Sequence, residues 1–230
     1  MDKHSHKNGI IEGTIWKQLL IFFFPILVGT FFQQLYNTVD AVIVGQFAGK
    51  EALSSVGGSS SQIINFVVGF FTGLSAGATV IISQFYGAND ANKIHRALHT
   101  AYAFSIVGGI IAGIIGIALT VPVMKLMNTP EELMHDSAMY VMIYFGGLVF
   151  IFVYNMGSAI LRAIGDSKRP LYYLIICCFI NIVLDIVFVS VLKLGVLGVA
   201  VATFISQLVS AVLVTRALMY HTEGMKLVLK

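Results

Sequence analysis

The sequence predicts an all-α integral membrane protein, a bundle of six transmembrane helices over residues 15–220. Of the 230 residues, 57% are hydrophobic and only 11% are charged, and the mean hydropathy is +0.88. Soluble domains carry roughly 25% charged residues, so these few charges could not cover a water-soluble globule. Long uncharged runs separate short charged groups, and the basic residues concentrate in alternate loops. Both patterns are typical of a multi-pass membrane protein.

Six uncharged runs account for the six expected spans. A helix needs about 20 residues to cross the hydrocarbon core, and five of the runs reach that length. The fifth run reaches it only if Asp185 lies inside the membrane, which extends the run to residue 192. The second run, roughly 57 Å as a helix, contains no charge or proline, so one tilted or protruding helix is expected. The runs are 18–39, 52–89, 97–124, 137–161, 171–184 and 194–215.

The distribution of Lys and Arg predicts the orientation. With the N-terminus in the cytoplasm, eleven basic residues lie on the cytoplasmic side and three on the outer side. Cytoplasmic loops carry such an excess, so both termini, including segments 1–14 and 221–230, are expected to be cytoplasmic. The inner residues are Lys3, Lys7, Lys17, Lys93, Arg96, Arg162, Lys168, Arg169, Arg216, Lys226 and Lys230, and the outer residues are Lys50, Lys125 and Lys193.

Turn-forming residues fall between the expected spans. The segments 128–130 and 194–198 are expected to turn the chain outside, and the segment 165–170 inside. Pro25 lies within the first span and Pro122 near the end of the third. Proline removes a backbone hydrogen bond, so we expect both residues to kink or break their helices.

Two carboxylates, Asp40 and Asp185, fall within the expected spans. A charge at that depth costs at least about 2.5–3.5 kcal/mol and usually marks an ion or proton path. Counting residues from the outer end of each helix places both carboxylates roughly 12–13 Å below it. Thr203 falls at a similar depth on the sixth span. The structural alternatives are a headgroup position for Asp40 and an interhelical hydrogen bond for Asp185.

Polar residues accompany both carboxylates on the same helix faces. Asn181 and Asp185 are four residues apart, and Gln33, Asn37 and Asp40 follow at spacings of four and three. Such a stripe should line a cavity or a buried interface. Two nearby carboxylates in a medium of low dielectric can hold a proton, or, with amide and hydroxyl oxygens added, a small cation such as Na⁺.

Other candidate chemistry is weaker. His95 and His99 have the spacing of zinc ligands on a helix, but no third ligand accompanies them. Neither membrane aspartate follows a glycine, as the active aspartate of an intramembrane aspartyl protease would. No basic cluster interleaved with aromatics suggests nucleic acid. The chain is therefore not expected to be an enzyme, to carry a cofactor or to bind nucleic acid.

Several motifs resemble those of the multidrug and toxic-compound extrusion (MATE) transporters. The run from Pro25 through Gln33, Gln34, Tyr36, Asn37 and Asp40 to Gly57 resembles the first two helices of that family. Residues 83–88 (SQFYGA) and 162–170 (RAIGDSKRP) resemble its loops between helices two and three and between helices four and five. These motifs occur in order, at sensible spacing, over residues 14 to about 216.

The resemblance implies a fold and an activity. MATE transporters consist of two six-helix bundles around a central cleft, and they export cationic or amphipathic drugs in exchange for H⁺ or Na⁺. The implied coupling residues are Asp40, Asn181, Asp185, Thr203 and Asn155, with the first four as the Na⁺ ligands if Na⁺ is the ion. The match to Asn181 and Asp185 points to the DNA-damage-inducible branch. Gln33, Gln34 and Asn37 are the implied supporting polar face, and Pro25 the implied hinge of the first helix.

The chain departs from the family in having six expected spans instead of twelve. A second six-helix lobe, in the same full-length chain or in a second copy, is therefore an expected partner, together with the lipid bilayer and the substrate. Residues 221–230 would then be a cytoplasmic tail or the start of the linker between lobes. A prokaryotic plasma membrane is the expected location. Two alternatives stay open: a lipid-linked oligosaccharide flippase of the same superfamily, and a membrane scaffold without transport activity.

Overall fold

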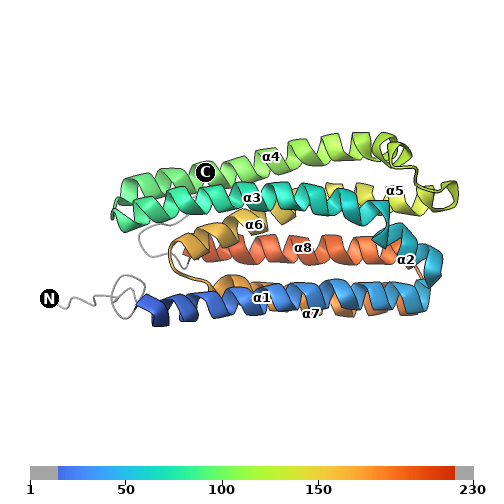
Figure 1. Cartoon of the computed structure of the whole chain (residues 1–230), viewed down its shortest axis with the longest axis horizontal. Helices are drawn as coiled ribbons and strands as arrows, with labels where there is room; N and C mark the ends of the chain where they lie inside the picture. Colours follow the sequence, from blue (N-terminus) through green and yellow to red (C-terminus); the bar gives the residue numbers. More distant parts are fainter. Residues whose placement is uncertain (1–14, 221–230) are drawn as a thin grey trace.

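The computed structural model describes residues 15–220 as a bundle of helices. Most of the helices are long and run lengthwise along the bundle (Figure 1). The elements in chain order are α1 (Ile15–Ile43), η1 (Val44–Ala48), α2 (Gly49–Gly57), α3 (Ser59–Gly87), α4 (Ala91–Leu126), α5 (Glu131–Gly146), α6 (Leu148–Ala163), α7 (Lys168–Asp185), η2 (Ile186–Val191) and α8 (Gly195–Tyr220). The elements η1 and η2 are short π-helical segments that continue α1 and α7.

The prediction of an all-helical six-span bundle is confirmed. In residues 15–220, five helical segments are long and apolar enough to cross a membrane, and α5 and α6 together form a sixth, bent by 48° between them. The apolar side chains on the outside of the bundle agree with this. Phe23, Phe66, Ile114 and Phe179, from four different helices, are each more than half exposed. A lipid environment suits such a surface, and water does not.

The two ends of the bundle differ in charge. One end holds the start of α1, the α3–α4 and α6–α7 turns and the end of α8, whereas α2 and the α4–α5 turn lie at the other (Figure 1). We call the first the basic end, because seven of the ten Lys and Arg residues in 15–220 fall in these segments. The opposite end has Lys50, Lys125 and Lys193. The basic end is the one predicted to face the cytoplasm.

The second uncharged run is not one helix, so the prediction for residues 52–89 was wrong. The chain breaks at Gly58, between the short α2 and the long α3. A Cβ at Gly58 would lie 2.7 Å from the backbone oxygen of Ser54, so only glycine fits this turn. A second glycine, Gly49, begins α2 with a φ of 92°, in the left-handed region that glycine favours. One glycine, Gly58, and no charge or proline, divides the run.

The fourth span is likewise divided at a glycine. The bend between α5 and α6 falls at Gly147, where a Cβ would come within 3.0 Å of the Phe204 ring of α8. Neither proline ends its helix, because Pro25 lies inside α1 and Pro122 inside α4. Of the two expected outcomes, a kink or a break, the structure excludes a break at either proline, and the breaks lie at glycines instead.

The core of the bundle is built around α6. This helix contacts α3, α4 and α8, and most of its side chains are buried, including Phe152, Met156 and Ile160. Helix α4 approaches very closely: a Cβ at Gly109 would lie 2.7 Å from Cα of Val149. Small residues allow such close backbone approach between membrane helices. The packed side formed by α6 and α8 supports the α1–α7 pair, which carries the polar residues.

Candidate functional site

Helices α1 and α7 lie side by side and bring together the polar residues predicted from the sequence (Figure 1). Asp40 lies on the last turns of α1, and Asn181 and Asp185 lie one turn apart at the end of α7. Asp40 is 9% exposed, and both Asn181 and Asp185 are 0% exposed. The carboxylates therefore lie inside the bundle, away from lipid. Ionised carboxylates at such depth need partners.

Asn181 connects the two carboxylates. Its amide nitrogen donates to Oδ1 of Asp40 at 2.8 Å and to Oδ2 of Asp185 at 3.0 Å. We orient the amide in this way because the reverse orientation would set its oxygen against two acceptor oxygens. An amide nitrogen has two hydrogens, so it can satisfy one oxygen of each aspartate at once.

The two carboxyl groups also lie within hydrogen-bonding reach of each other. Two fully ionised carboxylates would repel at this distance, whereas a shared proton forms a hydrogen bond between them. Oδ1 of Asp185 is buried and has no hydrogen-bond donor within the described part of the chain. A proton or a small cation would therefore find an available oxygen at this position.

Three hydroxyl groups surround the pair. The Tyr36 hydroxyl is within hydrogen-bonding reach of Asp40 and lies 3.5 Å from the Thr203 hydroxyl. Tyr140, on α5, is close enough to interact with both carboxyl groups. Tyr36 and Tyr140 were not predicted from the sequence. The four-residue spacing of Tyr36 and Asp40 was an available signal, whereas no local pattern points from Tyr140 to α1.

Asn155 lies in a different place. Its amide donates to the backbone oxygen of Ile151 in its own helix at 2.9 Å. It lines a polar cavity of about 120 Å³ between α1, α6 and α7, whose lining includes Pro25, Gln33, Ser158 and Arg162 but none of Asp40, Asn181, Asp185 and Thr203. The structure therefore groups Asn155 with the proline of α1 and not with the carboxylates.

The other polar residues of α1 lie partly at the polar cavity and partly on the surface of the bundle. Gln33, Gln34 and Asn37 are exposed, and the Asn37 amide donates to the side-chain oxygen of Gln34 at 3.4 Å. Gln33 also reaches the polar cavity. This stripe was expected to line a cavity or a buried interface. Within residues 15–220 it lies mostly on the outside of the bundle, next to the buried Asp40.

The donor set limits the ion that the site can bind. Across residues 15–220, no three His, Cys, Asp or Glu side chains gather as a metal site would require. His95 and His99 stack on each other on α4, and His99 bonds to the backbone oxygen of His95. Two carboxyls, one amide and hydroxyl groups suit a proton or a hard monovalent cation. Buried polar clusters of this kind are typical of membrane transport proteins.

Comparison with known proteins agrees with this class. The sequence pattern of the MatE family matches residues 25–187, a segment that includes Asp40, Asn181 and Asp185. The chain therefore belongs to the MatE family.

Two relatives from Bacillus subtilis (strain 168) are among the most similar curated proteins. "Probable multidrug resistance protein YoeA" is 32% identical over 201 residues, which are 86% of this chain and 43% of the relative. "Probable multidrug resistance protein YpnP" is 33% identical over 197 residues, which are 85% of this chain and 44% of the relative. The chain thus spans less than half the length of these relatives.

The fold is that of one lobe of a solved transporter. A crystal structure of MATE in the bent conformation superposes with a TM-score of 0.88 at 24% identity, covering 98% of this chain and 50% of the other. The members of this family are transporters and not enzymes, in agreement with the expectation from the sequence.

Proposed function

We propose that this chain forms one lobe of a secondary active antiporter that exports cationic or amphipathic drugs in exchange for protons. The Asp40–Asn181–Asp185 cluster is the coupling site. The observation that carries this proposal is the pair of buried carboxyls bridged by one amide within a MatE-family lobe. The names of the Bacillus subtilis relatives support multidrug export.

The orientation that we assign to the Asn181 amide suits H⁺ as the coupling ion. In this orientation the nitrogen faces both carboxyls, and the oxygen points away from them. A Na⁺ ion between the carboxylates would require oxygen ligands, so the Asn181 amide would have to turn over. A shared proton needs no such change. Na⁺ at Asp40, Asn181, Asp185 and Thr203 is therefore the second candidate for the coupling ion.

Pro25 and the polar cavity beside it provide a way to couple ion binding to a change in the conformation of α1. Proline leaves the backbone oxygen one turn earlier without its helical donor, so α1 can bend at this point. The cavity next to Pro25 is polar and is sized for a few water molecules, which can satisfy freed backbone groups. Protonation of Asp40, four turns further along α1, would shift the balance between a straight and a bent helix.

The exposed stripe of Gln33, Gln34 and Asn37 is the proposed contact with a second lobe. A row of amides is costly to leave in lipid, but it suits a water-filled cleft between two lobes. The partial coverage of the relatives agrees with a second lobe as partner. Amphipathic drugs would then lie beside the stripe and need not touch Asp40 or Asp185.

The test is transport by the complete protein in proteoliposomes under an imposed proton gradient. Asp40→Asn and Asp185→Asn each keep the shape of the side chain but remove the titrating group, so gradient-driven efflux should fall at least tenfold. The double variant should be little worse than either single variant, because the two carboxyls act as one unit. Glu131→Gln, at an exposed position on α5 outside the site, is the control and should transport normally.

Drug affinity measured on the same variants completes the test. Equilibrium drug binding should survive in Asp40→Asn, because the drug lies elsewhere. Normal proton-driven efflux by Asp40→Asn would refute the coupling role. Efflux that responds only to a Na⁺ gradient would assign Na⁺ instead. Absence of transport in the unaltered protein under both gradients would favour the scaffold alternative.

A further inference from the structure

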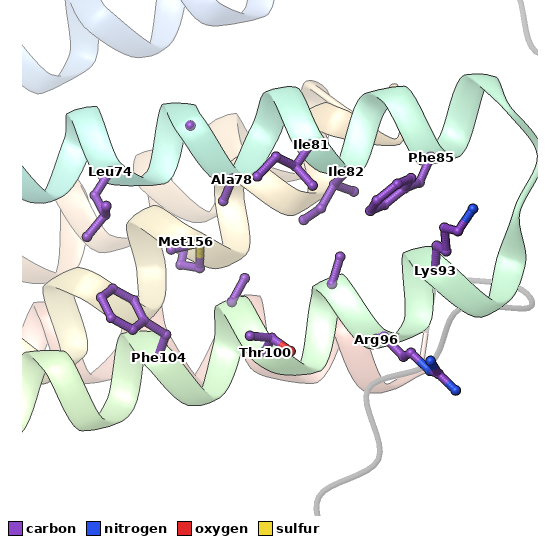
Figure 2. Close-up of a pocket in the computed structure, with 13 residues that line it drawn as sticks. Leu74, Ala78, Ile81, Ile82, Phe85, Lys93, Arg96, Thr100, Phe104 and Met156 are labelled. Atoms are coloured by element: carbon purple, nitrogen blue, oxygen red, sulfur yellow. The ribbon is translucent and has the colours of Figure 1, made fainter.

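A deep apolar groove separates α3 and α4 in the basic half of the bundle (Figure 2). The groove has a volume of about 620 Å³. Leu74, Ala78 and Phe85 line it from α3, and Ala97 and Phe104 line it from α4, with Met156 of α6 between the two helices. Small residues therefore make room between the helices. Larger apolar side chains form the rims.

The length of the groove matches one leaflet of a bilayer. From Phe85 to Leu74, eleven residues along α3, the groove runs roughly 16–17 Å. The hydrocarbon core of a bilayer is about 30 Å thick, so one leaflet occupies about half of that. The groove thus begins at the basic end of the bundle and ends near its middle. It has the depth of one acyl chain layer.

Cationic side chains lie only at the end of the groove that meets the membrane surface. Figure 2 shows Lys93 and Arg96 at the same end of the groove, away from Leu74 and Phe104; Lys93 points toward Phe85, and Arg96 points to the other side of α4. Lys93 pairs with Asp90 at 3.0 Å, and its hydrogen bonds lower the pKa of the Asp90 carboxyl, which stays ionised at neutral pH. Arg96 is exposed and has no ion pair within residues 15–220. Arg96 therefore provides the net positive charge at this mouth.

A second groove between the same two helices gives an internal comparison. It lies in the opposite half of the bundle, with a volume of about 520 Å³, between residues such as Phe66 of α3 and Ile115 of α4. None of its lining residues is charged. The same helix pair thus offers an apolar groove to each leaflet, but a cationic mouth to only one of them.

We propose that the α3–α4 groove of the basic half is a binding site for an anionic phospholipid. One acyl chain lies in the groove between Ala78 and Ala101, and the phosphate group lies at the end of the groove that carries the positive charges of Arg96 and Lys93. Basic pockets between membrane helices bind lipid headgroups in this way. A cationic drug fits the same groove poorly, because Arg96 would repel its charge. The site is separate from the coupling cluster, since its lining includes none of those residues.

The first experiment tests the role of charge. It uses native mass spectrometry of the complete protein, equilibrated with phosphatidylglycerol or phosphatidylcholine. Phosphatidylglycerol adducts should predominate. Arg96→Gln should weaken retention of phosphatidylglycerol about fivefold, because one basic residue near an anionic lipid surface usually strengthens binding by about this factor. Asp90→Asn should strengthen it, since Asn still caps α4 while Lys93 loses its counter-ion. The matched control is Lys125→Gln at the opposite end, which should retain phosphatidylglycerol unchanged.

The second experiment fills the groove with a larger side chain and leaves the charges unchanged. A Cβ at Gly77 meets nothing within 4 Å, and Gly77 lines the groove. Gly77→Leu should therefore fold and reduce phosphatidylglycerol retention several-fold. Gly69, on the same helix, is equally open but lines neither groove. Gly69→Leu is the matched control and should retain the lipid.

Three other outcomes would each contradict the proposed lipid site. Equal retention of both lipids would show that the groove does not recognise the anionic headgroup. Loss of binding in Arg96→Gln but not in Gly77→Leu would place the lipid on the surface instead of in the groove. Detection of a protein dimer without bound lipid, together with loss of that dimer in Gly77→Leu, would show that the groove is a dimer contact instead. None of these results bears on the coupling role of Asp40.

Discussion

At the scale of single residues, Asn181 is the side chain on which the site depends. It is fully buried and holds one oxygen of each carboxylate with the same nitrogen. Without it, two acids from different helices would face each other with no amide to bridge them. Its contribution is therefore both energetic and geometric, because it fixes α1 and α7 in register at the level of the acids.

We predict that Asn181→Ala destabilises the protein by about 2–3 kcal/mol, since two hydrogen bonds to carboxyl groups are lost in a buried place. Asn155→Ala should cost much less, because that amide bonds only to its own helix. Thermal unfolding of both variants in the same detergent measures the difference. Equal losses would mean that Asn181 does not bridge the carboxyls.

Asp40, Asn181, Asp185 and Thr203 could be predicted from the sequence, because polar groups inside an apolar helix are conspicuous and their depths can be counted. Tyr140 could not, because it reaches the acids through the packing of α5 and has no sequence neighbour among them. Asn155 was expected beside the acids by resemblance, whereas the structure places it beside Pro25. Contacts between distant helices depend on rotation about each helix axis, which spacing alone does not provide.

At the scale of elements, glycines determine where helices break and how closely they pack. The residues around Gly58 and Gly147 were predicted to be helical throughout, because uncharged runs give no sign of a bend. Helix propensity is a weak signal in a membrane, where backbone hydrogen bonds dominate. At both breaks a Cβ would crowd a neighbour, the Ser54 backbone oxygen at Gly58 and the Phe204 ring at Gly147, so glycine fits where a larger residue would not. The Phe204 contact exists only in the folded bundle.

The two π-helical segments are a second feature at the scale of elements. Segment η1 begins four residues after Asp40, η2 begins directly after Asp185, and the two contact each other. Such π turns inside helices often occur at functional sites. Each carboxylate thus lies just before a stretch of helix that is wider than normal. The sequence contains no proline or glycine cluster at η2 that would have predicted it.

The glycines of α4 provide a prediction about packing. A Cβ at Gly113 would lie 2.7 Å from the backbone oxygen of Phe145, so Gly113→Ala should force α4 and α5 apart and cost about 1–3 kcal/mol. Gly73 on α3 faces open space, and Gly73→Ala should be neutral or slightly stabilising, because alanine is the better helix former. Unfolding measurements on both variants test this. A neutral Gly113→Ala would show that the helices can separate at no cost.

At the scale of the whole molecule, the number of spans and their alternation could be predicted from hydropathy and charge alone. The seven and three basic residues at the two ends of the described bundle match the alternation inferred from the sequence. The exposed position of the polar stripe could not be predicted, because it depends on how α1 is rotated about its axis in the bundle.

Orientation can be tested by cysteine labelling in intact cells with a membrane-impermeant reagent. A cysteine at position 131, at the opposite end, should react from outside, and a cysteine at position 92, at the basic end, should react only after the membrane is opened. Glu131 and Asn92 are exposed, whereas the native Cys177 and Cys178 are buried and should stay silent. The reverse pattern would contradict the positive-inside prediction.

The depth of the carboxylates has an electrical consequence. With the opposite end outward, an ion that reaches Asp40 from outside crosses roughly 13 Å of a core about 30 Å thick, or about two fifths of the membrane voltage. A full crossing is worth about 2.3 kcal/mol per 100 mV, so this partial crossing is worth about 1 kcal/mol. A negative interior would therefore raise the occupancy of the site roughly fivefold per 100 mV with no difference in pH. The membrane potential therefore acts on the site as a change in proton concentration would, and a potassium diffusion potential imposed at equal pH should raise the proton occupancy of Asp40.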